Sequence, residues 1–314
     1  MKCKGKLAGS VRWLCFGILL VAAVCRLMEE RTFSIRPGAE LPPQRQQELS
    51  YPTLPYRPPE IPSLQFSGED GALVPVENDA GLDYDKEALL TAPLRLSVGD
   101  EPLVLIVHTH ATEAYTPGEG SYYTATAAYR TGDPAYNVVR VGQAIAQALN
   151  ARGIVTLHDE SLHDSFGYDD AYARTEETIR AYLQRYPSIQ MVIDVHRDAV
   201  ADGSGGQLAF CTQVEGAQTA RLLFVMGTNA AGQTHPGWQD NLSAALKLQV
   251  LCEKVAPGIF RPLSLRSQRY NQHLTPYSLL LEVGTAGNTL EEALRAADLF
   301  AEQLSVLLLE GSRD

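Results

Sequence analysis

The chain has 314 residues, with 26 lysines and arginines, 37 aspartates and glutamates, and a formal net charge of −11. Residues 1–26 contain five basic residues and no acidic one, so they carry +5 and the remainder carries −16. An acidic remainder excludes a nucleic-acid backbone as the partner, because phosphate contacts need clustered lysine and arginine. The hydrophobic content of 45% and the charged content of 20% indicate one large or two small globular domains.

The cysteines are too few and too scattered for a disulfide framework. Cys3, Cys15 and Cys25 lie in the N-terminal segment, which leaves only Cys211 and Cys252 for the rest of the chain. No Cys-x-x-Cys motif occurs, so zinc ribbons and thioredoxin-like redox sites are excluded. The sequence leaves open whether Cys211 and Cys252 are oxidised or reduced.

The N-terminus has the pattern of an export signal. Its basic residues precede an apolar run at 13–25, which flanking apolar residues extend toward the length of about 20 that a spanning helix needs. We expect residues 1–28 to be an uncleaved membrane anchor; a cleaved signal and a buried helix are the alternatives. The positive charge before the run predicts a cytoplasmic N-terminus and a domain outside the membrane.

A proline-rich segment follows the predicted anchor. Of the 18 prolines, 10 fall within 27–95, including the stretch YPTLPYRPPEIP. This composition favours extended polyproline geometry over a packed core. Residues 29–95 are therefore predicted to be a linker outside the cytoplasm.

From residue 96 onward, apolar runs alternate with amphipathic stretches. Strands are expected at 103–110, 153–159, 188–198, 208–212, 222–227 and 278–284, and helices at 137–151, 171–186, 238–255 and from 289 onward. Asp133-Pro134 resembles an N-cap for the first helix, and Thr289 with Glu292 forms a capping box for the last. The alternation predicts an α/β fold over 96–314, a three-layer domain with a largely parallel central sheet.

Reactive side chains follow three of the predicted strands. They are His108, His110 and Glu113 in the first motif, Asp194, His196 and Arg197 in the second, and Glu282 in the third. Ligands of such sheets bind at the carboxyl ends of the strands, so these groups are expected to meet. Two imidazoles and a carboxylate are usual ligands of a catalytic zinc ion. His110, Glu113 and His196 supply them, and Glu282 is left to take and return a proton.

The chain resembles two groups of hydrolases in these motifs. The order His-x-x-Glu, distant His, later Glu is similar to that of zinc carboxypeptidases. The closer resemblance is to the stage II sporulation protein P family. It rests on VLIVHTHATEAY (104–115), YNVVRVGQAIAQAL (136–149), RYPSIQMVIDVHRDA (185–199), RYNQHLTPYSLLLEVG (269–284) and the anchor-plus-linker layout.

This resemblance implies a zinc-dependent N-acetylmuramoyl-L-alanine amidase that cleaves peptidoglycan. Zinc would lie on His110, Glu113 and His196, and Glu282 would be the general base and acid. The family resemblance also implies a role in engulfment with stage II sporulation proteins D and M. The catalytic domain would then work in the intermembrane space of the sporulating cell.

Several assignments within the site have alternatives. Because His108 and His110 are two residues apart on a strand, both face one side and either is a candidate ligand. Similar amidases take their glutamate ligand from the start of the next helix, where the candidates are Asp133 and Asn137, with Glu119 earlier in the loop. The spacing between His110 and Glu113 favours that pair.

Two arginines and a group of tyrosines are further candidates. Arg197 and Arg269 are suited to stabilising an oxyanion or binding a stem-peptide carboxylate, with structural ion pairing as the alternative. The tyrosines of the loop 115–129 are candidates for stacking on sugar or peptide, or for packing over the site. Asp194 is a candidate to orient an imidazole.

Two other functions compete with the amidase. A zinc peptidase acting within the stem peptide would use every residue named above. A scaffold that binds cell wall and partner proteins without catalysis would carry a degenerate site, and the intact set of two histidines and two glutamates argues against it.

Overall fold

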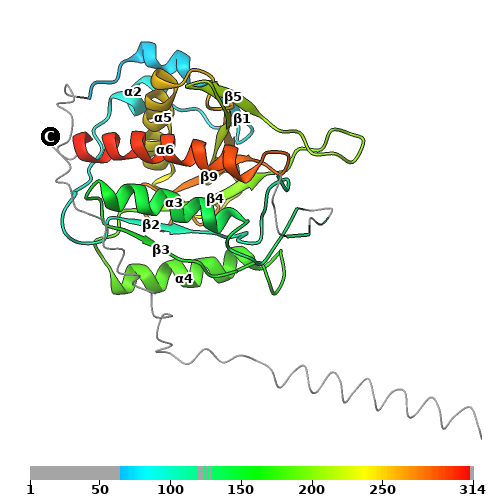
Figure 1. Ribbon diagram of the computed structural model, residues 1–314. Helices are drawn as coiled ribbons and strands as arrows, with labels where there is room; N and C mark the ends of the chain where they lie inside the picture. Colours follow the sequence, from blue (N-terminus) through cyan, green and yellow to red (C-terminus); the bar gives the residue numbers. More distant parts are fainter. Residues whose placement is uncertain (1–63, 119–122, 125, 127–128, 312–314) are drawn as a thin grey trace, which may run out of the picture. The chain divides into compact units, whose positions relative to one another are not determined.

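The structure is a computed structural model that describes residues 64–118, 123, 124, 126 and 129–311 (Figure 1). The predicted anchor and the linker up to residue 63 lie outside the described residues. Within the described part of the chain, no helix combines the length and apolar character needed to cross a membrane.

A seven-stranded sheet forms the centre of the domain, in the order β1–β8–β7–β9–β4–β2–β3. The strands are β1 (Val76–Asn78), β2 (Val104–Val107), β3 (Thr156–His158), β4 (Met191–Asp198), β7 (Leu222–Gly227), β8 (Leu263–Arg266) and β9 (Leu279–Thr285). All neighbours are parallel except β7 and β9, which are antiparallel. The predicted α/β fold with a largely parallel sheet is confirmed, and it consists of two parallel blocks joined at one antiparallel pair.

Helices cover the two faces of the sheet unequally. The longer ones are α3 (Val138–Ala151), α4 (Ala171–Arg185), α5 (Trp238–Val255) and α6 (Leu290–Gly311). Helices α3, α5 and α6 pack side by side on one face, and α4 lies on the other side of β2 and β3 (Figure 1). Helix α4 lies beside β2 and β3 and not over β7 and β8 (Figure 1).

The helix starts agree in part with the sequence. Thr289 and Glu292 form the predicted capping box of α6, each side chain accepting the other's backbone N–H. Helix α3, however, begins after Asn137, whose side chain accepts the N–H of Val139 at 2.9 Å. The predicted cap at Asp133 was wrong, because Asn137 lies directly before the helix and is an equally good capping residue.

The folded domain begins before the expected boundary at residue 96. Residues that were assigned to the linker form the 3-10 helix η1 (Gly68–Leu73), β1 and α2 (Lys86–Thr91). Strand β1 pairs with β8, Leu90 is buried, and the buried Lys247 of α5 donates to the Leu89 carbonyl. Proline content therefore did not reveal where the folded domain begins, since a three-residue strand and a six-residue helix carry little periodicity.

The predicted strand at 208–212 belongs to a separate hairpin. It corresponds to β5 (Cys211–Val214), which pairs only with β6 (Ala217–Ala220) in a two-stranded antiparallel sheet. The turn between them uses Glu215 and Gly216 at positive φ. Cys211 and the buried Cys252 are both free thiols.

Gly142 of α3 packs closely against the histidine rings that follow β2 and end β3. A Cβ atom there would lie 2.5 Å from the ring of the buried His108 and 3.0 Å from the ring of His158. We expect Gly142→Ala to lower the free energy of unfolding by about 1–2 kcal/mol, because overpacking outweighs the gain in helix propensity. Urea denaturation checks this, with the exposed Gln147→Ala on the same helix as control. A Gly142→Ala protein as stable as the control would contradict this packing.

Candidate metal centre and active-site cleft

A short turn after β2 carries the first two site residues. Strand β2 ends at Val107, and the turn is tied to the neighbouring strand β4 through Thr109. The Thr109 backbone N–H and hydroxyl donate to the two carboxylate oxygens of the buried Asp194, at 2.8 and 2.6 Å. The turn therefore holds His110 and Glu113 against β4.

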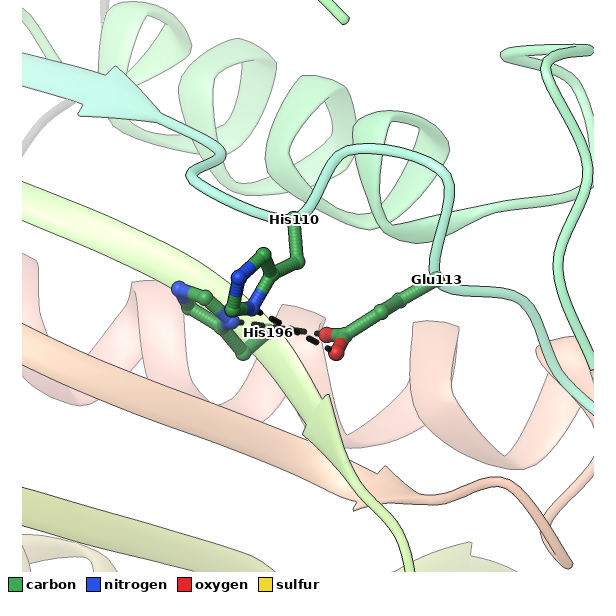
Figure 2. A group of neighbouring side chains, drawn as sticks. All are labelled: His110, Glu113 and His196. Atoms are coloured by element: carbon green, nitrogen blue, oxygen red, sulfur yellow. Dashed lines mark ion pairs between the residues drawn. The ribbon is translucent and has the colours of Figure 1, made fainter. Parts of the chain in front are cut away.

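Three buried side chains converge at this point (Figure 2). The Nδ1 atoms of His110 and His196 lie 3.8 and 3.4 Å from the two carboxylate oxygens of Glu113. One ligand atom from each residue lies within 4.8 Å of the others. The structure thus brings the three predicted ligands together.

The surroundings of the cluster favour positive charge. Burial alone would lower the pKa of His196, but Asp194 and Glu113 outweigh burial and raise this pKa well above its ordinary value. Burial alone would raise the pKa of Glu113, but His196, Arg197 and His110 lower it to about 2. A cation between these carboxylates is therefore stabilised, whether it is an imidazolium or a metal ion.

The donor set fits a divalent metal ion. His110 and His196 each direct Nδ1 toward Glu113, and the Nε2 atom of His196 lies 2.9 Å from Asp194. A carboxylate beside the second nitrogen of a ligating histidine fixes its ring and tautomer in many metal sites. The Nε2 atom of His110 is buried without a hydrogen-bond partner within the described chain.

Glu282 lies next to this cluster. It is in register with His196 across the β4–β9 pair, and both side chains line one cleft of about 350 Å³ together with His110 and Glu113. Burial, with a further contribution from Glu113, raises the pKa of Glu282 to about 8, although His196 opposes this. One oxygen of Glu282 has no hydrogen-bond partner among the described residues. A carboxylate in such surroundings is suited to accept and release a proton.

His108 is not part of the cluster. The strand ends before it, so strand alternation does not apply, and its ring lies against Gly142 of α3. Its Nδ1 atom bonds the Val195 carbonyl at 2.9 Å and its Nε2 atom contacts Nε2 of His158 at 2.9 Å. Of the two candidates, the structure therefore brings His110 and not His108 to Glu113.

The two arginines have different positions. Arg197 is buried; its guanidinium donates to the carbonyls of Ala114 and Tyr129, and its backbone N–H donates to Glu113. Arg269 lies 3.6 Å from Glu176 of α4 and is not among the described residues that line the cleft. Arg197 thus positions Glu113. Arg269 instead takes the alternative role considered for it, a structural ion pair.

Sequence reasoning missed the side chains that cover His110. Tyr168 stacks on the His110 ring at 4.0 Å between centroids, and Tyr172 of α4 contacts its edge at 5.6 Å. Arg130 bonds Asp164 at 2.7 Å and lies 3.5 Å from Glu113. These residues come from three segments without a shared motif, so only their tertiary positions reveal them.

The tyrosines of the loop 115–129 were expected either to stack on a ligand or to pack over the site. Tyr115 is buried under the site and donates to the Val283 carbonyl, so it packs and does not stack on a ligand. Tyr122 lies outside the described residues. The aromatic rings beside the cluster come instead from the segment around α4.

Comparison with solved structures returns N-acetylmuramoyl-L-alanine amidases at low similarity. An amidase of Nostoc punctiforme has 11% identity and a TM-score of 0.39, covering 68% of this chain and 97% of that one. The CwlD amidase of Clostridioides difficile, in complex with the GerS lipoprotein, has 13% identity and a TM-score of 0.38, covering 67% and 95%. At these values the solved structures add nothing to the assignment.

Sequence comparison is more decisive. Stage II sporulation protein P of Bacillus subtilis (strain 168) is 29% identical over 233 residues, which are 70% of this chain and 55% of that protein. The chain thus spans about half the length of this curated relative. The family model of stage II sporulation protein P matches residues 71–305, which include every site residue described above. The chain belongs to the stage II sporulation protein P family.

Proposed function

We propose that the protein is a zinc-dependent hydrolase that cleaves the amide between N-acetylmuramic acid and L-alanine in peptidoglycan. The observation that carries the proposal is the convergence of His110, Glu113 and His196 with Glu282 in one cleft. Membership of a sporulation protein family supports wall remodelling during sporulation as its setting. The complete set of residues argues against a scaffold without catalysis.

His110, Glu113 and His196 would hold the zinc ion, with Asp194 orienting His196. When bound there, zinc supplies Lewis acidity, which lowers the pKa of water and polarises a carbonyl group. Arg197 and Arg130 keep the Glu113 carboxylate in place from two sides. The protein thereby presents a preformed, buried donor set at the wall of the cleft.

Glu282 would move the proton. Its carboxylate lines the cleft beside His196, and burial raises its pKa, so it holds a proton more tightly than an exposed glutamate. It takes a proton from the attacking water and returns it to the alanine nitrogen as the amide breaks. The neutral amine that results is the better leaving group.

The setting of the enzyme is part of the same proposal. An anchor at residues 1–28 would hold the catalytic domain outside the cytoplasmic membrane, and the family resemblance implies stage II sporulation proteins D and M as partners. A zinc peptidase acting within the stem peptide is the second candidate, because the cleft chemistry suits any amide.

Metal analysis of purified protein tests the ligands. The wild-type chain is expected to contain about one zinc per molecule. His110→Ala and His196→Ala each remove a ligand and are expected to purify with little zinc, whereas the control His273→Ala, which alters a histidine beside Glu176, keeps it. Circular dichroism verifies that each variant is folded. Full zinc content in a folded His196→Ala protein would contradict this donor set.

Substitution of Glu282 tests the mechanism. Glu282→Gln keeps shape and removes the proton carrier, so we expect at least about a hundredfold slower release of fragments from purified sacculi. Zinc content and thermal stability should match the wild type. The control Glu77→Gln lies on the exposed strand β1 and should retain full activity. Wild-type rates from a folded, zinc-loaded Glu282→Gln protein would rule out this role.

Mass spectrometry of the released fragments separates the two candidate reactions. An amidase releases intact stem peptides, whereas a peptidase leaves the first stem residue on the glycan and releases shortened peptides. We expect intact stems, and no release when a chelator removes the metal. Release of shortened stem peptides would contradict the amidase reaction and favour the peptidase reaction.

A further inference from the structure

The cleft extends across the sheet, away from the metal cluster. Alternate residues of a strand share a face, and the register aligns His196 with Glu282, Glu282 with Leu223, and Val225 with Ser264. The side chain two residues beyond Ser264 on the same face is Arg266, which also lines the cleft. The floor of the cleft therefore runs across β4, β9, β7 and β8 and ends at the guanidinium of Arg266.

Arg266 is held only lightly. Its side chain is 43% exposed and pairs with Asp79, which is 57% exposed and directly follows β1. Exposed ion pairs contribute little to stability, so Arg266 can exchange Asp79 for another carboxylate at low cost. The two other arginines of the cleft, Arg130 and Arg197, are already engaged with Glu113.

A strained segment forms the wall beside Arg266. Tyr270 and Asn271 have φ values of 47° and 58°, a left-handed conformation that is costly for a tyrosine and better tolerated by an asparagine. The Gln272 side chain bonds two backbone groups of β7, and Asn271 donates to the carbonyl of Tyr172 on α4. These bonds on both sides maintain the strain and present Tyr270 to the cleft, 5.9 Å from the Tyr172 ring.

Charge differs between the two ends of the cleft. Glu113, Glu282 and Asp198 line the end near the metal cluster, and Asp198 is paired with Arg261. Glu113 is paired as well, since Arg130 and Arg197 also line the cleft here. At the far end Arg266 is the charged side chain that lines the cleft among the described residues.

We propose that Arg266, with Tyr270 beside it, forms a subsite for a carboxylate of the peptide on the leaving side of the cleaved amide. This inference rests on the proposed function and adds the substrate group that is recognised. Strand spacing and residue rise place the backbones of Glu282 and Arg266 roughly 16 Å apart. An extended peptide covers about 3.5 Å per residue, and the long arginine side chain shortens the span. The second and third stem residues are therefore the carboxylate carriers in reach.

Binding of an N-acetylmuramoyl tripeptide tests the subsite. Calorimetry uses the full chain carrying Glu282→Gln, so that the peptide is not consumed, with and without Arg266→Gln. Three peptides are compared: one with free carboxylates, one with the D-glutamate α-carboxylate amidated, and one with the terminal carboxylates amidated. We expect Arg266→Gln to lower the affinity for the peptide with free carboxylates about ten- to hundredfold. The same substitution should change little the affinity for the peptide whose recognised carboxylate is amidated.

Further variants separate recognition from folding. Arg266→Lys keeps the charge and should retain part of the affinity, whereas the control Arg295→Gln, which alters an arginine on α6 that bonds the Gln218 carbonyl, should behave as wild type. Equal losses with all three peptides, or no measurable binding of the free peptide, would overturn the subsite. If the Glu282→Gln protein binds in the expected pattern but the wild type releases no stem peptides from sacculi, the subsite stands and the proposed reaction fails.

Discussion

The site depends on the carboxylate of Asp194. It is buried in β4, where it accepts two hydrogen bonds from Thr109 and lies 2.9 Å from His196. One side chain therefore ties the turn after β2 to its neighbouring strand and orients one imidazole of the cluster. Burial would raise the pKa of Asp194, but these contacts lower it to about 2. The charge remains in place across the physiological pH range and stabilises a cation beside it.

The second constraint is the unequal cover of the sheet. Three long helices bury one face, whereas α4 covers the other face only beside β2 and β3 (Figure 1). The antiparallel pair of β7 and β9 joins the second parallel block to the first. This arrangement produces a cleft that extends over the floor of the sheet from Glu282 to Arg266. A substrate can thus contact the metal cluster and a distant arginine at the same time.

The sequence did not separate the roles of His108 and His110. Both residues fit a strand pattern, and spacing alone favoured His110. The chain leaves the sheet after Val107, so the following residues turn and the two rings point in different directions. His108 packs under α3 against Gly142, a contact between segments that no local pattern encodes. Similarly, Arg269 shares a motif with Glu282 but pairs with Glu176 of α4, which lies far away in the sequence.

The sequence by itself determined the α/β class, the order of most strands and helices, and the identities of the residues that meet in the cluster. Apolar periodicity and capping residues are local properties, and reactive groups at the ends of parallel strands must meet at one edge. Only the tertiary structure decided the start of the domain, the direction of His108, the aromatic cover from Tyr168 and Tyr172, and the position of Arg266. These features depend on contacts between segments far apart in the chain, whose geometry is set by packing and not by local sequence.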